Sequence, residues 1–493
     1  MKTLHTLFIA LGGLLLCASC DNYLDIKPKG VTLPEKFEDY ERLLNHSSTM
    51  RIDNTYTIYI TDDIELGEDT MQFCDYARKL DYQKNLYSFE HGAIFSEGDG
   101  DALYENAYDR IYTINVVVNS VNDCPDGSDE QKRQLIAKAR FNRAYEYLML
   151  VNAYAPAYDP TTAESDWGVP LLLSYAINQE YHRNTVAGVY QQIISDLEYA
   201  EVNLPDEVTS YYFPNKRCAY ALAARTYLYM GNYEKARDYA EKVMLSEDPL
   251  IDLTEYIINP DANRWGMGRI YNSVTETTYP TVEEGNTEIL LARDAGLVNL
   301  SRTIFVNKDL VEVYSHDLPE GAVDQRRDLF TADNFFRYMN NRQTFWFEGR
   351  TVWVEYCDIN GGLNYQEMML TLAECYVRLN MAGAQPDGLE KAYALLDRLR
   401  DKRIKNNQPL PHKDAHSALI TVLEERRREL AFRGSHRFFD LKRLSKESEF
   451  VKEIVHKIGE EQTFTMSSDD PRMVLPLPPR VIAANPSLPV YER

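Results

Sequence analysis

The chain has 493 residues and a formal net charge of -23, from 76 acidic and 53 basic side chains. Its hydrophobic content of 44% is ample for a large core, which excludes a disordered chain. The acidity argues against nucleic-acid binding, which needs a basic stripe, and against docking on an anionic membrane through charge. Tyr is unusually common, with 35 Tyr against 18 Phe and 4 Trp, and a ring with a polar tip suits both half-buried seams and binding platforms.

The N-terminus predicts export and lipid anchoring. Residues 1–19 carry one basic residue, Lys2, and then an apolar run that is too short for a membrane helix. Small residues lead to Cys20 as in a bacterial lipobox, although Cys17 stands where that motif usually has Leu. We therefore expect cleavage and acylation of Cys20, with 20–34 as an extended tether. The alternative is an ordinary cleaved signal with an incidental Cys.

The remaining cysteines predict no special chemistry. They are widely spaced, five in number, and form no C-x-x-C pair, so neither a zinc site nor a disulfide framework is indicated. Cys218 and Cys375 lie in helical patterns, where we expect small core residues. We expect no structural metal and no cofactor.

Helical periodicity dominates the first half of the chain. Apolar residues recur at helical spacing in four segments, separated by a Pro/Gly turn at 125–128 and a loop-like stretch at 155–185. The expected helices are 35–46, 101–122, 129–154 and 186–203.

Two segments resemble tetratricopeptide units, in which two antiparallel helices are joined by a tight turn. In 216–248, Gly231 lies at the turn and Tyr227 and Tyr233 lie at packing positions. In 364–403 the turn is longer. Several such units share one continuous core, whereas a single unit cannot.

Helical periodicity is poor in 250–360, which holds three of the four Trp, many Gly and short β-prone runs such as 287–291. A loop-rich insertion on a helical scaffold is where function tends to lie. The Pro-rich final stretch from Pro476 to Pro489 is predicted to be non-helical and to fold back over the body.

Several short motifs occur in a defined order along the chain. They read CDNYLD at 20–25, ARFNRAY at 139–145 with GVPL at 168–171, TVLEERRRELAF at 421–432 with RFFDL at 437–441, and LPLP at 475–478 with NP at 485–486. Together these motifs resemble those of the SusD/RagB family of Bacteroidetes outer-surface lipoproteins. Tyr104 stands where that family often has Trp, and Arg433 stands where it often has an acid.

The resemblance implies a mainly α fold, with a tetratricopeptide-like scaffold of helical pairs and a loop-rich, partly β insertion in the middle. We expect a single SusD-like domain after the signal and tether. This domain spans 35–493. Its parts are an N-terminal part at 35–215, the tetratricopeptide-like unit at 216–248, the loop-rich insertion at 250–360 and the C-terminal part at 361–493.

The charged run at 424–429 is predicted to be structural. Its charges alternate in sign, so partners three and four residues apart are available, and Arg437 and Asp440 are expected to join them. The alternative is a clamp for an anion or a substrate.

No catalytic motif is present, and we predict that the chain is not an enzyme. The acid cluster that begins at Asp62 and Asp63 is expected to be a solvated loop. Other interpretations are a carbohydrate-contacting pair, paired catalytic carboxylates or a Ca²⁺ site without EF-hand spacing.

A sugar-binding surface needs aromatic planes for the C–H faces of the ring and polar groups for its hydroxyl rim. For each aromatic the alternative is a ring in the core or at a seam. Guided by the family resemblance, we predict that the ligand-binding residues are Asp62, Asp63, Tyr82, Tyr104, Trp265, Tyr271, Tyr279, Trp346 and Trp353.

The resemblance implies a lipoprotein of the outer membrane that faces the cell exterior. It would capture oligosaccharide or polysaccharide and deliver it, as a lid, to a TonB-dependent SusC-like transporter. Two alternatives stay open: a RagB-like protein that binds peptide or another nutrient, and a helical-repeat scaffold that only holds proteins. The sequence does not name the glycan.

Overall fold

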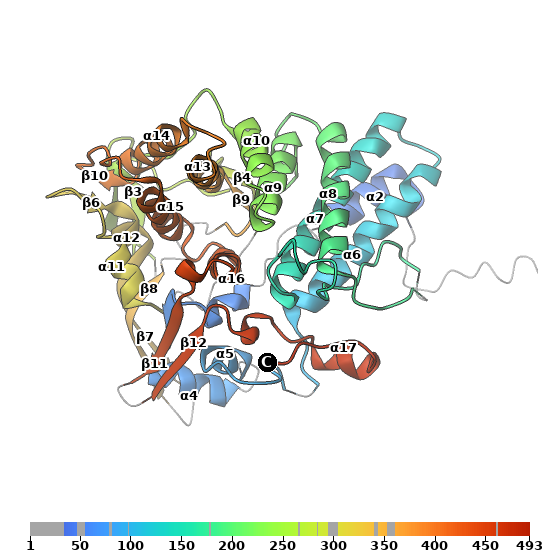
Figure 1. Ribbon diagram of the computed structural model, residues 1–493, viewed down its shortest axis with the longest axis horizontal. Coiled ribbons are helices and arrows are strands. Elements are labelled where there is room, and N and C mark those ends of the chain that lie inside the picture. The colour runs from blue at the N-terminus through green and yellow to red at the C-terminus, as the bar shows by residue number, and fades with distance from the viewer. Residues whose placement is uncertain are drawn as a thin grey trace, which may run out of the picture.

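The computed structural model describes most of the chain after the predicted signal and tether, and Cys20 lies outside the described residues. The helices follow one another across the molecule, and the small two-stranded sheets lie mostly at the left of the view (Figure 1). The described residues are 34–46, 55–77, 81–96, 98–176, 179–264, 267–282, 284–293, 304–339, 344–352, 360–459 and 462–493.

The first group of helices confirms the periodicity of the N-terminal half. The C-terminal half of α7 is buried on all sides, because α6, α8 and α9 pack around it. Ser128 begins α7 with a capping box that it shares with Gln131, and Asp101 caps the start of α6. The bounds are α2 Phe37–Leu44, α6 Ala102–Ser120, α7 Asp129–Tyr154 and α8 Val186–Asn203.

Both predicted helical pairs are present. Gly231 and Gly383 adopt φ of 71° and 73° in the turns, a conformation that L side chains rarely adopt. The two pairs pack against each other through α10 and α13, so that one core runs through the array. The bounds are α9 Lys216–Tyr229, α10 Tyr233–Val243, α13 Tyr365–Met381 and α14 Gly388–Asp401. Cys218 and Cys375 are buried within them, as expected.

The middle of the chain is partly β, as predicted, but its strands are longer than the short β-prone runs indicate. Two hairpins dominate it: β2 Tyr256–Arg264 with β3 Met267–Asn272, and β7 Thr331–Met339 with β8 Thr344–Val352. Shorter elements connect them to the helices. These are β4 Ile289–Leu291, β5 Phe305–Val306, α11 Lys308–Val313, β6 Val323–Asp324, α12 Gln325–Phe330 and β9 Leu363–Asn364.

The C-terminal part returns across the molecule, as expected. The N–H of Leu475 donates to the carbonyl of Ala153 at 3.0 Å, which ties the final stretch to the end of α7. The prediction of a wholly non-helical ending is wrong at α17 Pro479–Ala484, because Pro is tolerated in the first turn of a helix, where its missing N–H has no intrahelical partner. The other elements are β10 Ile404–Lys405, α15 Ala415–Leu430, α16 His436–Leu444, β11 Glu453–Ile458 and β12 Gln462–Ser467.

A short N-terminal segment completes the fold beside the C-terminal hairpin (Figure 1). It contains a 3-10 turn η1 Thr55–Ile60, β1 Ile64–Glu65, α4 Glu68–Ala77 and α5 Asp81–Tyr87. The observed fold confirms the expected mainly helical class with small sheets in the middle. The division into parts stays a prediction.

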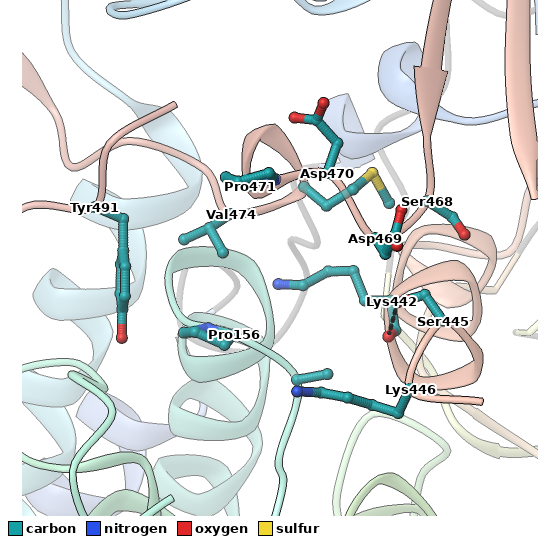
Figure 2. A pocket seen from close by; sticks show the side chains of 12 residues that line it. Pro156, Lys442, Ser445, Lys446, Ser468, Asp469, Asp470, Pro471, Val474 and Tyr491 are labelled. Atoms are coloured by element: carbon teal, nitrogen blue, oxygen red, sulfur yellow. Dashed lines mark hydrogen bonds between the residues drawn. The ribbon is translucent and has the colours of Figure 1, made fainter. Parts of the chain in front are cut away.

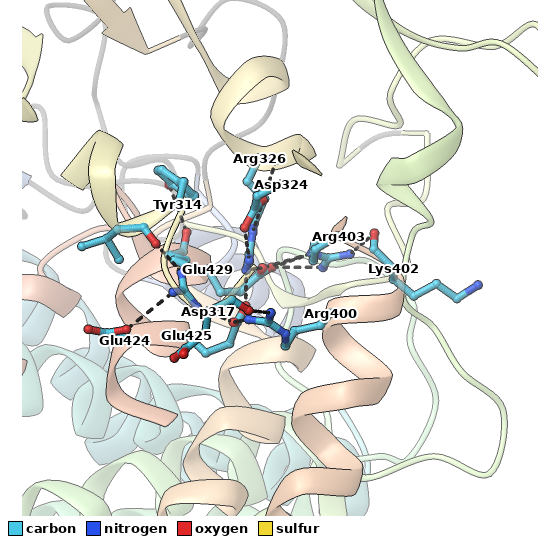
Figure 3. A network of polar contacts seen from close by, with 12 residues as sticks. Tyr314, Asp317, Asp324, Arg326, Arg400, Lys402, Arg403, Glu424, Glu425 and Glu429 are labelled. Carbon is cyan, nitrogen blue, oxygen red and sulfur yellow. Dashed lines mark hydrogen bonds and ion pairs between the residues drawn. The ribbon is translucent and has the colours of Figure 1, made fainter. Parts of the chain in front are cut away.

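The charged run on α15 is buried in a network of ion pairs (Figure 3). Glu425 contacts Arg326 at 2.7 Å, Arg400 at 3.1 Å and Arg428 at 2.9 Å. Glu429 lies 2.8 Å from Arg326 and 3.0 Å from Arg403.

The same network reaches two further carboxylates outside α15. Arg403 pairs with Glu288 at 2.6 Å, and Arg326 pairs with Asp324 at 2.6 Å. Four guanidinium groups thus meet four carboxylates, and the prediction that this run has a structural role agrees with the geometry.

We expect Glu425→Gln to lower the free energy of unfolding by about 3–5 kcal/mol, because it leaves three buried arginines with too little negative charge. Urea denaturation of the mature chain measures the change. Asp387→Asn is the matched control, since it breaks an exposed pair with Lys391 and is expected to cost less than about 1 kcal/mol. Equal losses in the two variants would contradict a structural role for the network.

Candidate ligand-binding surface

Asp62 and Asp63 are buried between η1 and β1, so the expectation of a solvated acidic loop is wrong at these two residues. Asp62 accepts from Arg437 at 2.7 Å and lies 2.5 Å from the amine of Lys452, and Asp63 accepts from Arg427 at 2.9 Å. Burial alone would raise the pKa of Asp62, but attraction to Arg437 and Arg427 outweighs it and holds the pKa well below its usual range. These carboxylates therefore bind cations of the protein itself.

Tyr104 lies in the hydrophobic core, and Tyr82 is partly buried and packs against that core. The Tyr82 ring stacks on Phe95 with centroids 5.5 Å apart. The Tyr104 hydroxyl hydrogen-bonds with that of Tyr181 at 2.7 Å, and burial raises the pKa of Tyr104 well above its usual value. For these two residues the geometry favours the alternative of core packing over ligand contact.

The predicted aromatics of the middle region that the structure describes differ in their surroundings. Tyr279 is buried against Tyr256, with ring centroids 5.7 Å apart, and Tyr271 is half-buried in β3. Trp346 is 47% exposed on β8, and the guanidinium of Arg337 lies 5.3 Å from its ring. Trp265 and Trp353 lie outside the described residues.

One Trp–Tyr pair that was not predicted combines an exposed ring with a half-buried one. Trp167 is 41% exposed, and its ring centroid lies 5.4 Å from that of Tyr491. The Tyr491 hydroxyl donates to the carbonyl of Trp167 at 3.0 Å, which fixes the C-terminal tail against the loop after α7.

Arg183 contacts both the Tyr491 ring and the backbone of the loop that carries Trp167. Its guanidinium lies 5.1 Å from the Tyr491 ring and donates to the carbonyls of Gly168 at 2.7 Å and Tyr154 at 2.6 Å. The position of Trp167 in a predicted loop could have marked it as a binding residue. Its partner Tyr491 lies 324 residues further along the chain, so the local sequence pattern does not reveal the pair.

A cavity of about 430 Å³ lies beside Tyr491, and we call it the tail cavity. Figure 2 shows Tyr491 on one side and Lys442, Ser445 and Asp469 on the opposite side. Its wall comes from the loop after α7, from α16 and from the chain that follows β12. The lining residues are Pro156, Ala157, Lys442, Ser445, Lys446, Ser468, Asp469, Asp470, Pro471, Met473, Val474 and Tyr491.

Lys442 is the most perturbed group in this wall. Its amine donates to the carbonyls of Asn152 and Ala155, the latter at 2.8 Å, and it pairs with no carboxylate of the described residues. Burial, with a smaller effect from Lys446, lowers the pKa of Lys442 to about 7. Lys446 is more exposed and lies 3.4 Å from Asp159.

The surface therefore joins aromatic ring faces to hydroxyl, carboxylate and amine groups. This combination matches a sugar, whose C–H faces pack on rings and whose hydroxyls bond to polar groups. Within the described part of the chain, no three His, Cys, Asp or Glu side chains gather as a metal site would require. None of the described helices has the length and apolar character needed to cross a membrane.

Comparison with known proteins shows that two parts of the chain are similar to SusD-like proteins. A family model described as "Starch-binding associating with outer membrane" matches residues 22–228, and one described as "SusD family" matches 364–489. SusD-like protein P2 of Formosa agariphila is 29% identical over 253 residues, which cover 50% of this chain and 47% of that protein. The match thus spans about half the length of that relative.

Solved structures share the fold over nearly the whole chain. A SusD superfamily protein from Bacteroides thetaiotaomicron matches with a TM-score of 0.63 at 19% identity, covering 93% of this chain and 100% of that one. A SusD-like carbohydrate binding protein from Bacteroides vulgatus matches with a TM-score of 0.60 at 17% identity, covering 92% and 98%. At this identity the likeness establishes the fold.

The buried amine of Lys442 predicts a pH dependence of stability. Below pH 7 it is charged in the folded and unfolded chain. Between about 7 and its unfolded value near 10.5 only the unfolded chain keeps the proton, so stability rises with pH. We expect the stability of the wild type relative to Lys442→Met to rise by about 1 kcal/mol per pH unit between about pH 7 and 9.

Urea denaturation across that pH range measures the difference. Lys457→Met, a change at an exposed lysine of β11, serves as the control. If the difference in unfolding free energy between the wild type and Lys442→Met stays constant with pH, Lys442 does not carry a neutral amine in the folded protein.

Proposed function

Because the chain belongs to the SusD/RagB family, we propose that it is a cell-surface lipoprotein that captures oligosaccharide and delivers it to a TonB-dependent, SusC-like transporter. The family consists of binding proteins, and membership confirms the prediction that the chain is not an enzyme. The family description names association with the outer membrane, where we place the lipid-anchored protein facing the exterior.

The observation that carries the proposal is the Trp167–Tyr491 ring pair, in which Trp167 is exposed and the half-buried Tyr491 also lines the tail cavity. The planes of the two rings are inclined by 50° to each other. A curved oligosaccharide can therefore pack more than one of its sugar residues on them. Ser445, Lys446 and Asp469 supply hydrogen-bonding groups across the cavity. Because each sugar contact is weak, affinity requires several of them on a surface that is already ordered.

Two features support a surface that is held rigid before the ligand arrives. Arg183 binds both the loop and the tail, and the tail is further fixed where Arg493 donates to the carbonyl of Gly92 at 2.6 Å. A preformed site avoids the entropy cost of ordering loops on binding. The exposed Trp346 on the distant hairpin is proposed as a second, weaker contact for a long glycan.

The glycan class is proposed from similarity. The family model carries the words starch-binding, and the Bacteroides vulgatus structure is that of a carbohydrate binding protein. A peptide ligand is the alternative, and it would favour apolar pockets and exposed strand edges over ring faces. The role as a lid would gate entry to the transporter by movement, and simultaneous contact of glycan with both proteins would raise the effective concentration.

We expect Trp167→Ala to weaken binding of the preferred oligosaccharide by about tenfold, or about 1.4 kcal/mol, because it removes one of the two ring faces. Affinity electrophoresis against a glycan panel that includes starch finds the ligand, and calorimetry measures the change. Tyr112→Ala is the matched control, since Tyr112 is 52% exposed on α6, away from the tail cavity.

Turnover of a bound glycan would sink the proposal, as would equal losses in Trp167→Ala and Tyr112→Ala. Heat released with a peptide mixture and none with oligosaccharides would favour the peptide alternative.

Anchoring makes a separate prediction. We expect Cys20→Ser to move the protein from the membrane fraction to the soluble fraction of the cell, because acyl chains provide about 0.8 kcal/mol per buried methylene. Fractionation and labelling with a fatty-acid analogue measure both effects. Cys124→Ser is the control, since Cys124 lies in the described body of the protein. Retention of the Cys20→Ser variant in the membrane would show that another feature anchors the chain.

A further inference from the structure

A second cavity, of about 330 Å³, lies between α15 and α16 on the side of α16 opposite the tail cavity. Arg437, Leu441 and Leu444 of α16 face it, whereas Lys442, Ser445 and Lys446 face the tail cavity. Its body is apolar. The apolar lining residues are Val313, Ile420, Leu423, Leu441, Leu444 and Phe450.

One end of this cavity is cationic. Arg427, Arg437 and Lys452 line it, and all three point at the buried carboxylates of Asp62 and Asp63. Three cations against two carboxylates leave one positive charge uncompensated. In a chain with a net charge of -23, a pocket end with excess positive charge is a local exception.

The two arginines keep unused donors. Arg427 bonds through Nε and Nη2 to Asp63 and Asp62, and Arg437 bonds through Nε and Nη2 to Asp62. Neither Nη1 atom donates a hydrogen bond to any residue that the structure describes. Both arginines line the cavity, where a bound acceptor would meet these donors.

The two acidic groups of the cavity lie beside basic residues other than the three at its cationic end. Glu449 is 3.4 Å from His416, and Glu424 is 3.5 Å from Arg428. Their side chains are 48% exposed for Glu449 and 32% exposed for Glu424, so solvent screens their charges more than those of the buried Asp62 and Asp63.

We propose that this cavity binds a small molecule or chain end that joins one carboxylate to a compact apolar group. The carboxylate would accept hydrogen bonds from the open guanidinium donors, which are stronger than neutral bonds. The apolar group would fill the space between α15 and α16, where each buried methylene contributes about 0.8 kcal/mol. Free aryl or alkyl acids and the C-terminal residue of a peptide both present this chemistry.

The test uses calorimetry and ligand-observed NMR on the mature chain with 3-phenylpropanoate, its neutral amide and N-acetylphenylalanine. We expect the acid to bind at least tenfold more tightly than the amide. Lys452→Met should weaken the acid several-fold and leave the amide unchanged. Lys457→Met, at an exposed lysine of the same hairpin, should change neither. Tighter binding of N-acetylphenylalanine than of 3-phenylpropanoate identifies a peptide end as the source, and the reverse identifies a free acid.

Ile420→Glu keeps the proposal testable if Lys452→Met unfolds. Ile420 is 42% exposed at the rim, so the change is compatible with folding, and the added carboxylate should abolish binding of the acid by repulsion and bulk. Equal affinities for acid and amide, the same affinity in Ile420→Glu, or no binding at millimolar concentration would each overturn the proposal.

Discussion

Burial of the α15 charges is the constraint on which the rest of the structure depends. Five consecutive residues, Glu425 to Glu429, are all buried, so their charges point in every direction around the helix. An unpaired buried ion costs several kcal/mol, so every side chain needs a partner from another element. Glu425 takes its partners from α12 and α14, and Glu429 from α12 and from Arg403 just after α14. Arg426 pairs with Asp440 of α16, and Arg427 pairs with Asp62 and Asp63.

These partners come from distant parts of the chain, so one helix sets their relative positions. The N-terminal segment, the middle insertion, the second helical pair and the C-terminal helix all contact it. An apolar helix at the same place would tolerate sliding and rotation, whereas guanidinium–carboxylate pairs have a defined geometry. The network therefore fixes the relative positions of these segments, in addition to stabilising the fold. Both cavities depend on this arrangement, because α16, which lies between them, is held to α15 by the pair of Asp440 with Arg426 and to α13 by the pair of Arg443 with Glu374.

The helical scaffold could be predicted from the sequence because each helix shows its apolar period locally. The turn glycines and the charge alternation at 424–429 are also local, and both predictions agree with the structure. Asp62 and Asp63 were misjudged as solvated because their cationic partners lie more than 360 residues away. The same distance problem hid Tyr491 as the partner of Trp167. The local residue pattern predicts whether a segment forms a helix or a strand. Whether a charge or a ring in that segment is buried depends on which distant part of the chain packs against it.

The many Tyr residues of the chain fall into two groups, one in the helical scaffold and one in irregular segments. Tyr227, Tyr376 and Tyr393 are buried in the seams of the helical pairs, where a ring fills space and a hydroxyl finds a polar neighbour. Tyr491 is used differently, because it lies in a tail without helix or strand and contacts a loop that also has none. Such segments can present a ring to solvent only if something rigid holds them, and here Arg183 and the end of α7 do so. The proposed binding surface thus lies where two irregular segments meet on the helical array, and the array contributes to it by immobilising them.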